Sequence, residues 1–136
     1  MARGRDGKTD IWGIICRPKD LDPGKKYPVI EQIYAGPQGS FVPKSFSAYS
    51  QMQGQAELGF IVVQIDGMGT PGRSKAFHDA YYGRMGDNTI PDQVAGMKEL
   101  AQRYPFIDID KVGIWGHSGG GFATASAMFR HGPTDQ

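Results

Sequence analysis

The chain has 136 residues, about one domain's worth, and its 39% hydrophobic and 21% charged residues are typical of a globular protein rather than a disordered one. Fifteen basic and fourteen acidic side chains leave a net charge of +1, which argues against nucleic acid or an anionic membrane surface as a partner. No apolar run approaches the ~20 residues of a membrane-spanning helix, so we expect no membrane segment in this chain.

The first residues and the single cysteine carry little functional information. Met1 is followed by ARGRDGKTD, which lacks the apolar core of a signal peptide. We interpret the basic residues Arg3, Arg5 and Lys8 as a solvated end. Cys16 is the only cysteine, so the sequence holds no internal disulfide and no CxxC zinc site. Because it lies in the apolar run IWGIIC, we expect a buried, inert thiol.

The first half of the chain predicts three strands and one helix. β-Branched and aromatic residues over 11–17, IWGIICR, predict a strand, and PVIEQIY over 28–34 predicts a second. Apolar residues then recur at helical spacing, with Ser45 as the expected cap and Gly59 as the expected stop. FIVVQID over 60–66 has five apolar residues in seven and predicts a buried strand.

The second half predicts two helices around one strand. Pro91 suits the first turn of a helix, and Pro105 ends it. FIDID is interpreted as a turn into the strand KVGIW over 111–115, and a helix over 120–130 follows. Strands that alternate with helices predict an α/β fold, with a mostly parallel sheet and crossover helices. The helix between the two prolines presents one apolar face, formed by Val94, Met97, Ala101 and Tyr104.

One serine stands inside a run of glycines in KVGIWGHSGGGFATASAMFRHG, residues 111–132. Residues 116–120 match G-x-S-x-G, with a predicted strand before the motif and a predicted helix after it. A serine on such a tight turn needs neighbours without side chains, and the new helix directs its N–H groups and positive end toward the hydroxyl. We therefore interpret Ser118 as a catalytic nucleophile; the alternative is a structural glycine turn. His117 is interpreted as packing at the turn rather than as a base.

Two other uses of a glycine run do not fit. A dinucleotide loop needs G-x-G-x-x-G, which the glycines at 116, 119, 120 and 121 do not provide. A phosphate loop needs Gly-Lys followed by Ser or Thr, and no such sequence occurs. We therefore predict no cofactor and no metal.

Three blocks of the sequence resemble the catalytic domain of prolyl oligopeptidase-type serine peptidases, and within them the dipeptidyl-peptidase IV branch. The blocks are KKYPVIEQIYAGPQGSFVPKSF, FIVVQIDGMGTPGRSKAFHDAYYGRMG and PDQVAGMKELAQRYPFIDIDKVGIWGHSGGGFATA. The resemblance runs from about residue 10 to the end of the chain. It implies an α/β-hydrolase fold, of which residues 1–136 are the amino-terminal part of the catalytic domain.

The resemblance also implies an activity and its residues. The family cleaves peptide bonds through an acyl-enzyme, which makes a short peptide the expected substrate, with a preference for proline or alanine at the penultimate position. Ser118 takes the nucleophile's position, the Tyr34 hydroxyl that of one oxyanion donor, and the Gly119 N–H that of the second. Gly119 departs from the branch, which has tyrosine there, so the proline preference is in doubt. For a full-length protein, the formation of homo-oligomers stays open.

Five further polar residues are not expected to act in catalysis directly. Asp66, His78 and Asp79 match blocks of the family that shape the fold. Glu31 and Gln32 lie in the middle of a strand that should be buried. The sequence offers no reason for these two beyond a supporting role behind the site.

A serine nucleophile needs a histidine base oriented by a carboxylate, and in α/β-hydrolases these follow the serine in the order Asp, then His. After Ser118 the chain has only His131 and Asp135, in the reverse order. We expect the base and its carboxylate to lie beyond Gln136, and the propeller of the family before Met1. Two alternatives to a peptidase are an ester hydrolase on the same fold and a non-catalytic binding module.

Overall fold

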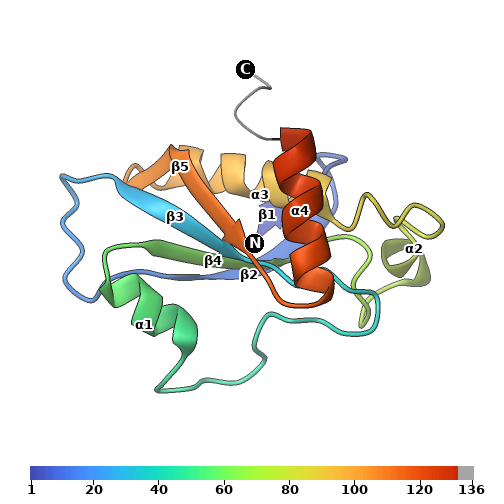
Figure 1. Ribbon diagram of the computed structural model, residues 1–136, viewed down its shortest axis with the longest axis horizontal. Helices are drawn as coiled ribbons and strands as arrows, with labels where there is room; N and C mark the ends of the chain where they lie inside the picture. Colours follow the sequence, from blue (N-terminus) through green and yellow to red (C-terminus); the bar gives the residue numbers. More distant parts are fainter. Residues whose placement is uncertain (132–136) are drawn as a thin grey trace.

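Five strands form one sheet in the computed structural model, which describes residues 1–131 (Figure 1). The strand order is β1-β2-β4-β3-β5, antiparallel over β1-β2-β4 and parallel over β4-β3-β5. The α/β prediction is confirmed, with a sheet that is parallel in one half only. The strands are β1 (Ala2–Arg3), β2 (Asp10–Cys16), β3 (Tyr27–Gln32), β4 (Ile61–Asp66) and β5 (Ile107–Trp115). The helices are α1 (Gln51–Glu57), α2 (Lys75–His78), α3 (Ile90–Arg103) and α4 (Gly119–His131).

Helices cover both faces of the sheet, because side chains along the parallel strands alternate between the two faces. On one face Met52 of α1 packs with Val62 of β4. On the other face Met97 of α3 packs with Val63, and Ala123 of α4 packs with Ile33, which follows β3. Figure 1 shows α1 below the sheet, with α3 and α4 above it. The parallel pairing of β3 with β5, which reaches Gln32 and Trp115, holds the carboxyl ends of the two strands side by side.

The helix predicted between Ser45 and Gly59 is half as long in the structure. Helix α1 begins at Gln51, and Ser50 rather than Ser45 is its cap, its hydroxyl accepting from the Gln53 N–H at 3.1 Å. The preceding aromatic residues lie at helical spacing, but Phe46 and Tyr49 are each 93% exposed. They pack against no sheet, so the apolar face that would stabilise a helix there is missing. The prediction for 45–50 is therefore wrong.

Two strands differ from the prediction. Strand β5 begins at Ile107, so FIDID is strand rather than turn, and a bulge over 109–111 separates its pairing with Pro28 from its pairing with Val29. Strand β1 was not predicted, because two residues are too few to show a period. Cys16 is half-buried rather than buried, and this burial raises the pKa of its thiol.

Helices α3 and α4 match the predicted segments. Helix α3 ends at Arg103, so Tyr104 of the predicted apolar face follows the helix. Of the four residues predicted to form that face, Met97 is buried and the other three are partly buried. Within residues 1–131, no helix is both long and apolar enough to cross a bilayer.

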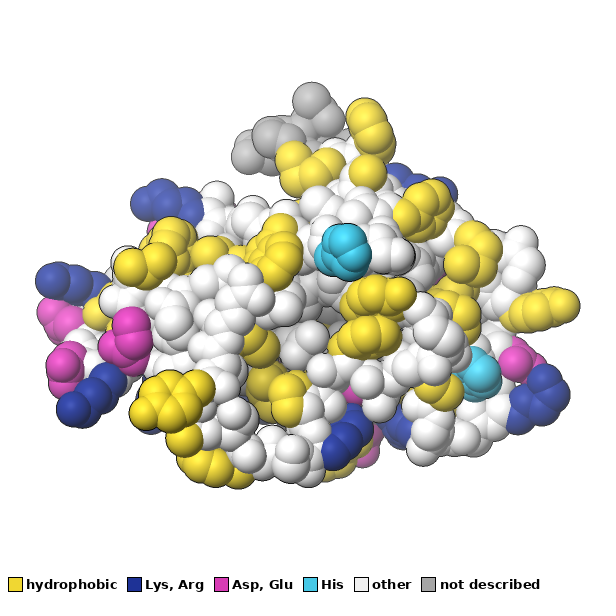
Figure 2. Space-filling model, turned by 60° about the horizontal axis from the view of Figure 1, so that its bottom comes forward, with side chains coloured by type: hydrophobic (Ala, Val, Ile, Leu, Met, Phe, Trp, Pro, Cys, Tyr) yellow, Lys and Arg dark blue, Asp and Glu magenta, His cyan; other side chains and the backbone are white. Residues whose placement is uncertain are grey.

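Helix α4 and β5 expose the large apolar side chains Ile109, Val112, Phe122, Met128 and Phe129. Figure 2 shows hydrophobic side chains at several places on the surface of one face.

Candidate active site

Ser118 lies on the turn that joins the end of β5 to the start of α4 (Figure 1). Its φ is +55°, a left-handed conformation that a residue with a side chain adopts at a cost in free energy. The serine is exposed, and its carbonyl accepts from the Phe122 N–H at 3.1 Å, which opens the first turn of the helix. A strained, exposed serine between a strand and a helix has the backbone of a nucleophile elbow.

The glycines on either side of this serine are required by the neighbouring strand. A Cβ on Gly116 or on Gly120 would lie 2.2 Å from the carbonyl oxygen of Ile33. This oxygen belongs to the backbone directly after β3, so no side-chain movement could relieve the contact. The glycine run is thus a close-packed turn rather than a flexible loop. The role of Ser118 in chemistry stays a prediction.

Tyr34 and Gly119, the two predicted oxyanion donors, are neighbours. Gln32 of β3 is paired with Trp115 of β5, so the segments that follow these strands leave the sheet together. A Cβ built on Gly119 would lie 3.4 Å from Cε1 and 3.6 Å from Cζ of the Tyr34 ring. Gly119 is the first residue of α4, so its N–H has no acceptor within the helix.

The Tyr34 side chain is held from two sides. Its ring stacks on Phe41 with a centroid distance of 3.9 Å. Its hydroxyl accepts from the Gln38 side chain at 2.8 Å, which leaves the hydroxyl proton available for donation. A cavity of about 270 Å³ adjoins the two predicted donors and is lined by Tyr34, Gly36, Gln38, Met85, Gly119 and Phe122. The cavity therefore has two candidate hydrogen-bond donors beside it, the Gly119 N–H and the Tyr34 O–H.

The three histidines do not form a catalytic pair in the described part of the chain. His78 contacts the carbonyl of Pro37 at 2.8 Å through Nε2. His117 is exposed beside the serine, so the expectation that it packs at the turn is wrong. His131 ends α4, roughly 18 Å from Gly119 at 1.5 Å per residue. Within residues 1–131 no histidine forms an ion pair with a carboxylate, and Asp135 lies outside the described residues.

The described residues also contain no group of three or more His, Cys, Asp and Glu side chains arranged to hold a metal ion.

Asp66 ends β4 and fixes the loop that carries Phe41, since it accepts from the Phe41 N–H at 2.8 Å and the Val42 N–H at 3.3 Å. Lys44 approaches the same carboxylate at 3.3 Å. Because Phe41 stacks on Tyr34, this carboxylate supports the candidate site indirectly, as expected for a fold-shaping residue.

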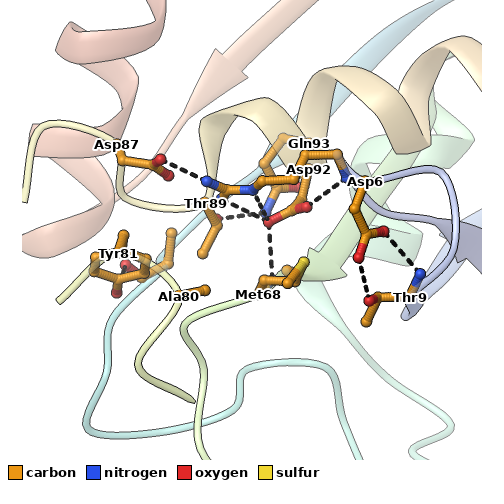
Figure 3. A network of polar contacts seen from close by, with 12 residues as sticks. Asp6, Thr9, Met68, Ala80, Tyr81, Asp87, Thr89, Asp92 and Gln93 are labelled. Carbon is orange, nitrogen blue, oxygen red and sulfur yellow. Dashed lines mark hydrogen bonds and ion pairs between the residues drawn. The ribbon is translucent and has the colours of Figure 1, made fainter. Parts of the chain in front are cut away.

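A largely buried ion cluster ties the start of the chain to the first turn of α3 and to the segment before it. The prediction of a solvated basic end is therefore wrong for one residue, Arg5. Arg5 pairs with Asp87 and with Asp92, whose side chain is 0% exposed (Figure 3). Asp92 also accepts from the Arg5 N–H at 2.8 Å and from the Met68 N–H at 3.0 Å. Burial lowers the pKa of Arg5, but its hydrogen bonds to the two carboxylates raise that pKa above its usual value.

Sequence reasoning missed this cluster because Arg5 lies more than 80 positions from both of its carboxylate partners. The only signal in the sequence was Asp92 in the first turn of a helix, which is an ordinary place for an acidic residue. The cluster fixes the loop after β4 through the hydrogen bond from the Met68 N–H to Asp92. Arg3, by contrast, pairs with Asp10 on the surface, where the two side chains are 52% and 36% exposed.

Glu31, which the sequence left unexplained, is a carboxyl group in the core. It is 6% exposed, and its Oε1 has no hydrogen-bond partner among the described residues. Burial raises its pKa to about 7. It lines a cavity of about 320 Å³ between β5, α3 and α4, together with Gln93, Lys98 and Ile114. Near neutral pH this side chain is therefore partly uncharged.

Comparison with known proteins identifies the relatives of this chain. Residues 44–134 match the model of the Prolyl oligopeptidase family. Human Dipeptidyl peptidase 8 is 43% identical over 122 residues, which cover 88% of this chain and 14% of that protein. A protein of Emericella nidulans named dipeptidyl-aminopeptidase B is 38% identical over 112 residues, or 82% of this chain and 12% of the relative.

The fold has a solved counterpart. The crystal structure of a Bacteroides ovatus protein assigned as a dipeptidyl aminopeptidase IV superposes with a TM-score of 0.86 at 33% identity. The match covers 95% of this chain and 18% of that one. The chain thus spans between 12% and 18% of the length of these relatives. The sheet with its crossover helices is that of a partial α/β-hydrolase domain, and the chain belongs to the prolyl oligopeptidase family.

Proposed function

We propose that the chain supplies the nucleophile and the oxyanion donors of a serine peptidase that cleaves short peptides, in the manner of a dipeptidyl peptidase. The observation that carries the proposal is the left-handed Ser118 on a glycine-packed turn, with the Tyr34 ring against Gly119. Family membership supports the reaction class, and the names of the relatives support the substrate class.

The proposed reaction forms and then hydrolyses an acyl-enzyme. The Ser118 hydroxyl oxygen attacks the carbonyl carbon of the scissile peptide bond while a base takes the hydroxyl proton. The carbonyl oxygen becomes an oxyanion and accepts from the Gly119 N–H and the Tyr34 O–H. Breaking the C–N bond releases the amine, which takes the proton, and leaves an ester on Ser118. Water then attacks the carbonyl carbon of this ester while the base takes a proton from it. The C–O bond to Ser118 breaks, the serine oxygen regains a proton, and the second peptide product leaves.

The base and its carboxylate are proposed to come from a longer polypeptide than the residues described. This follows from chemistry, since a serine hydroxyl is a weak nucleophile without a base. His78 is engaged with Pro37, and His131 stands at the far end of α4. Neither is assigned the role.

An esterase on the same fold is the second candidate, because the cavity beside Tyr34 and Gly119 would serve any acyl transfer. The two activities differ in the leaving group, an amine or an alcohol. Gly119 stands where the dipeptidyl-peptidase IV branch has tyrosine, so the preference for proline or alanine at the penultimate position has to be measured for this protein.

The test compares substrates on the full-length protein that contains this chain. We expect Gly-Pro and Ala-Pro chromogenic dipeptides to be cleaved with a higher kcat/KM than an acetyl ester, and Ser118→Ala to remove both activities. Turnover of the ester alone would favour the esterase. Full activity in Ser118→Ala would contradict both enzymes. No turnover of either substrate by the wild-type protein would favour a non-catalytic module.

A further inference from the structure

Tyr81 lies behind the candidate site and contacts the residue after Tyr34. Its side chain is buried, with 2% exposure, and its hydroxyl donates to the carbonyl oxygen of Ala35 at 3.3 Å. Burial, with a smaller contribution from the charge of Asp87, raises the pKa of Tyr81. The hydroxyl therefore stays protonated across the pH range of a peptidase assay and keeps its role as a donor.

The backbone of Ala35 adopts a strained conformation, which needs a contact such as this hydrogen bond to hold it. Its φ is +55°, in the left-handed region that disfavours residues with a Cβ, and the residue is buried. A strained backbone persists only where its surroundings fix it, and such positions cluster at functional sites. Relaxation of Ala35 toward an extended conformation would rotate the peptide that follows Tyr34, and with it the direction of the Tyr34 side chain.

The Tyr81 ring is itself fixed in place. It fills the space above Gly69, whose φ is +115°; a Cβ there would lie 1.8 Å from the ring. The Gly69 N–H donates to the Phe77 carbonyl at 2.7 Å. The preceding residue, Met68, donates its N–H to Asp92 of the buried ion cluster at 3.0 Å (Figure 3). Tyr81 thus connects the rigid loop after β4 to the strained turn after β3.

We propose that Tyr81 is a positioning residue for the oxyanion donor: its hydroxyl holds the Ala35 carbonyl and so fixes the direction of the Tyr34 hydroxyl. The inference rests on the proposed function, since it assigns Tyr81 a part in the same reaction. A ring that only fills space over Gly69 needs no hydroxyl. Tyr81→Phe keeps the ring and removes only the donor, so it separates packing from positioning.

The test measures kcat and KM on the full-length protein for the best chromogenic dipeptide. Tyr81→Phe is expected to lower kcat about five- to tenfold, the effect of one hydrogen bond, and to leave KM within about twofold. Tyr82→Phe is the matched control, because Tyr82 is 87% exposed, and it should match the wild type. In a Tyr34→Phe background, Tyr81→Phe should cause no further loss, since the donor it positions is gone.

A third variant tests the strain directly. Ala35→Gly removes the steric penalty of the left-handed φ, so Tyr81→Phe combined with Ala35→Gly should recover part of the lost kcat. An unchanged kcat in Tyr81→Phe, or the full loss in the Tyr34→Phe background, would overturn the inference. A wild-type protein that neither turns over substrate nor reacts at Ser118 would instead overturn the proposed function, which keeps the two failures distinct.

Discussion

The Ser118 turn and the Arg5 cluster are held in place by different means. The conformation of the turn is set by five consecutive residues, 116–120, whose glycines allow the chain to pass the carbonyl of Ile33. Arg5 instead pairs with carboxylates 82 and 87 positions away. A local backbone pattern is visible in a sequence, whereas a pairing across the chain is visible only once the fold brings the partners together.

The comparison also separates two kinds of fragility. The turn should fail through steric overlap, which no neighbouring side chain can relieve, because the obstacle is backbone. The cluster should fail through desolvation, because a carboxylate that is 0% exposed loses its counter-charge. The predictions below test each kind against a control of the same chemistry.

The largest effect is expected from Gly120→Ala. The Cβ of the new alanine would lie 2.2 Å from the Ile33 carbonyl oxygen, so β3 or the turn must move. We expect the free energy of unfolding to fall by at least ~3 kcal/mol and all activity to be lost. Urea unfolding and dipeptide turnover measure both. Gly54→Ala is the matched control, since nothing lies within 4 Å of its Cβ in α1, and it should stabilise by roughly 0.5–1 kcal/mol. Equal stability of the two variants would contradict the steric account.

Tyr34→Phe probes the chemistry at the turn rather than its packing. If the Tyr34 hydroxyl donates to the oxyanion, kcat should fall about 10²–10³-fold, or ~2.7–4 kcal/mol of activation free energy. KM should change little, because the bond forms mainly in the transition state. Steady-state kinetics on the full-length protein separate the two constants. An effect confined to KM would make Tyr34 a wall of the substrate pocket instead.

Arg5→Ala tests the cluster and should lower the free energy of unfolding by about 3 kcal/mol. This is the lower end of the range for a broken buried ion pair, because the Arg5 side chain is itself partly exposed. Arg3→Ala removes the same side chain from a surface pair with Asp10, so its loss should stay within about 1 kcal/mol. Thermal or urea unfolding of both variants gives the difference. Similar losses for the two arginines would show that Arg5 contributes no more than a surface pair.

The last prediction concerns how the free energy of unfolding depends on pH through Glu31. Its folded pKa, about 7, lies above the ordinary value of 4.5, so the folded state holds the proton more tightly. The protonated Glu31 therefore stabilises the folded state fully below pH ~4.5, and this contribution is lost as the pH rises through ~7. Over that range the free energy of unfolding falls by up to roughly 3 kcal/mol. Glu31→Gln, which cannot ionise, should be less pH-dependent than the wild type between pH 5 and 8. Parallel stability curves for the two proteins would rule this out.

Much of the fold followed from the sequence where local pattern and burial agree. The apolar run over 60–66 contains the buried strand β4. Pro91 lies in the first turn of α3, as predicted, and Pro105 follows the end of that helix. Spacing misled at Phe46 and Tyr49, where aromatic residues repeat without a surface to pack on. The bulge in β5 depends on its register with β3, which no single strand encodes.

The same division holds for the candidate site. The glycine motif indicated the position of Ser118, and its left-handed φ agrees with a strained turn. The supports behind it, Tyr81 against Gly69 and Asp92 on the Met68 N–H, join three separate segments. None of these residues stands in a motif, so only the structure identifies them.

The most direct test of the account is covalent labelling of the full-length protein with a fluorophosphonate, followed by mass spectrometry of the modified peptide. The account predicts a single adduct on Ser118, within the peptide of β5 and α4, and no adduct in Ser118→Ala at an unchanged melting temperature. An adduct on another serine, or undiminished labelling and turnover in Ser118→Ala, would contradict the central claim that this turn carries the nucleophile.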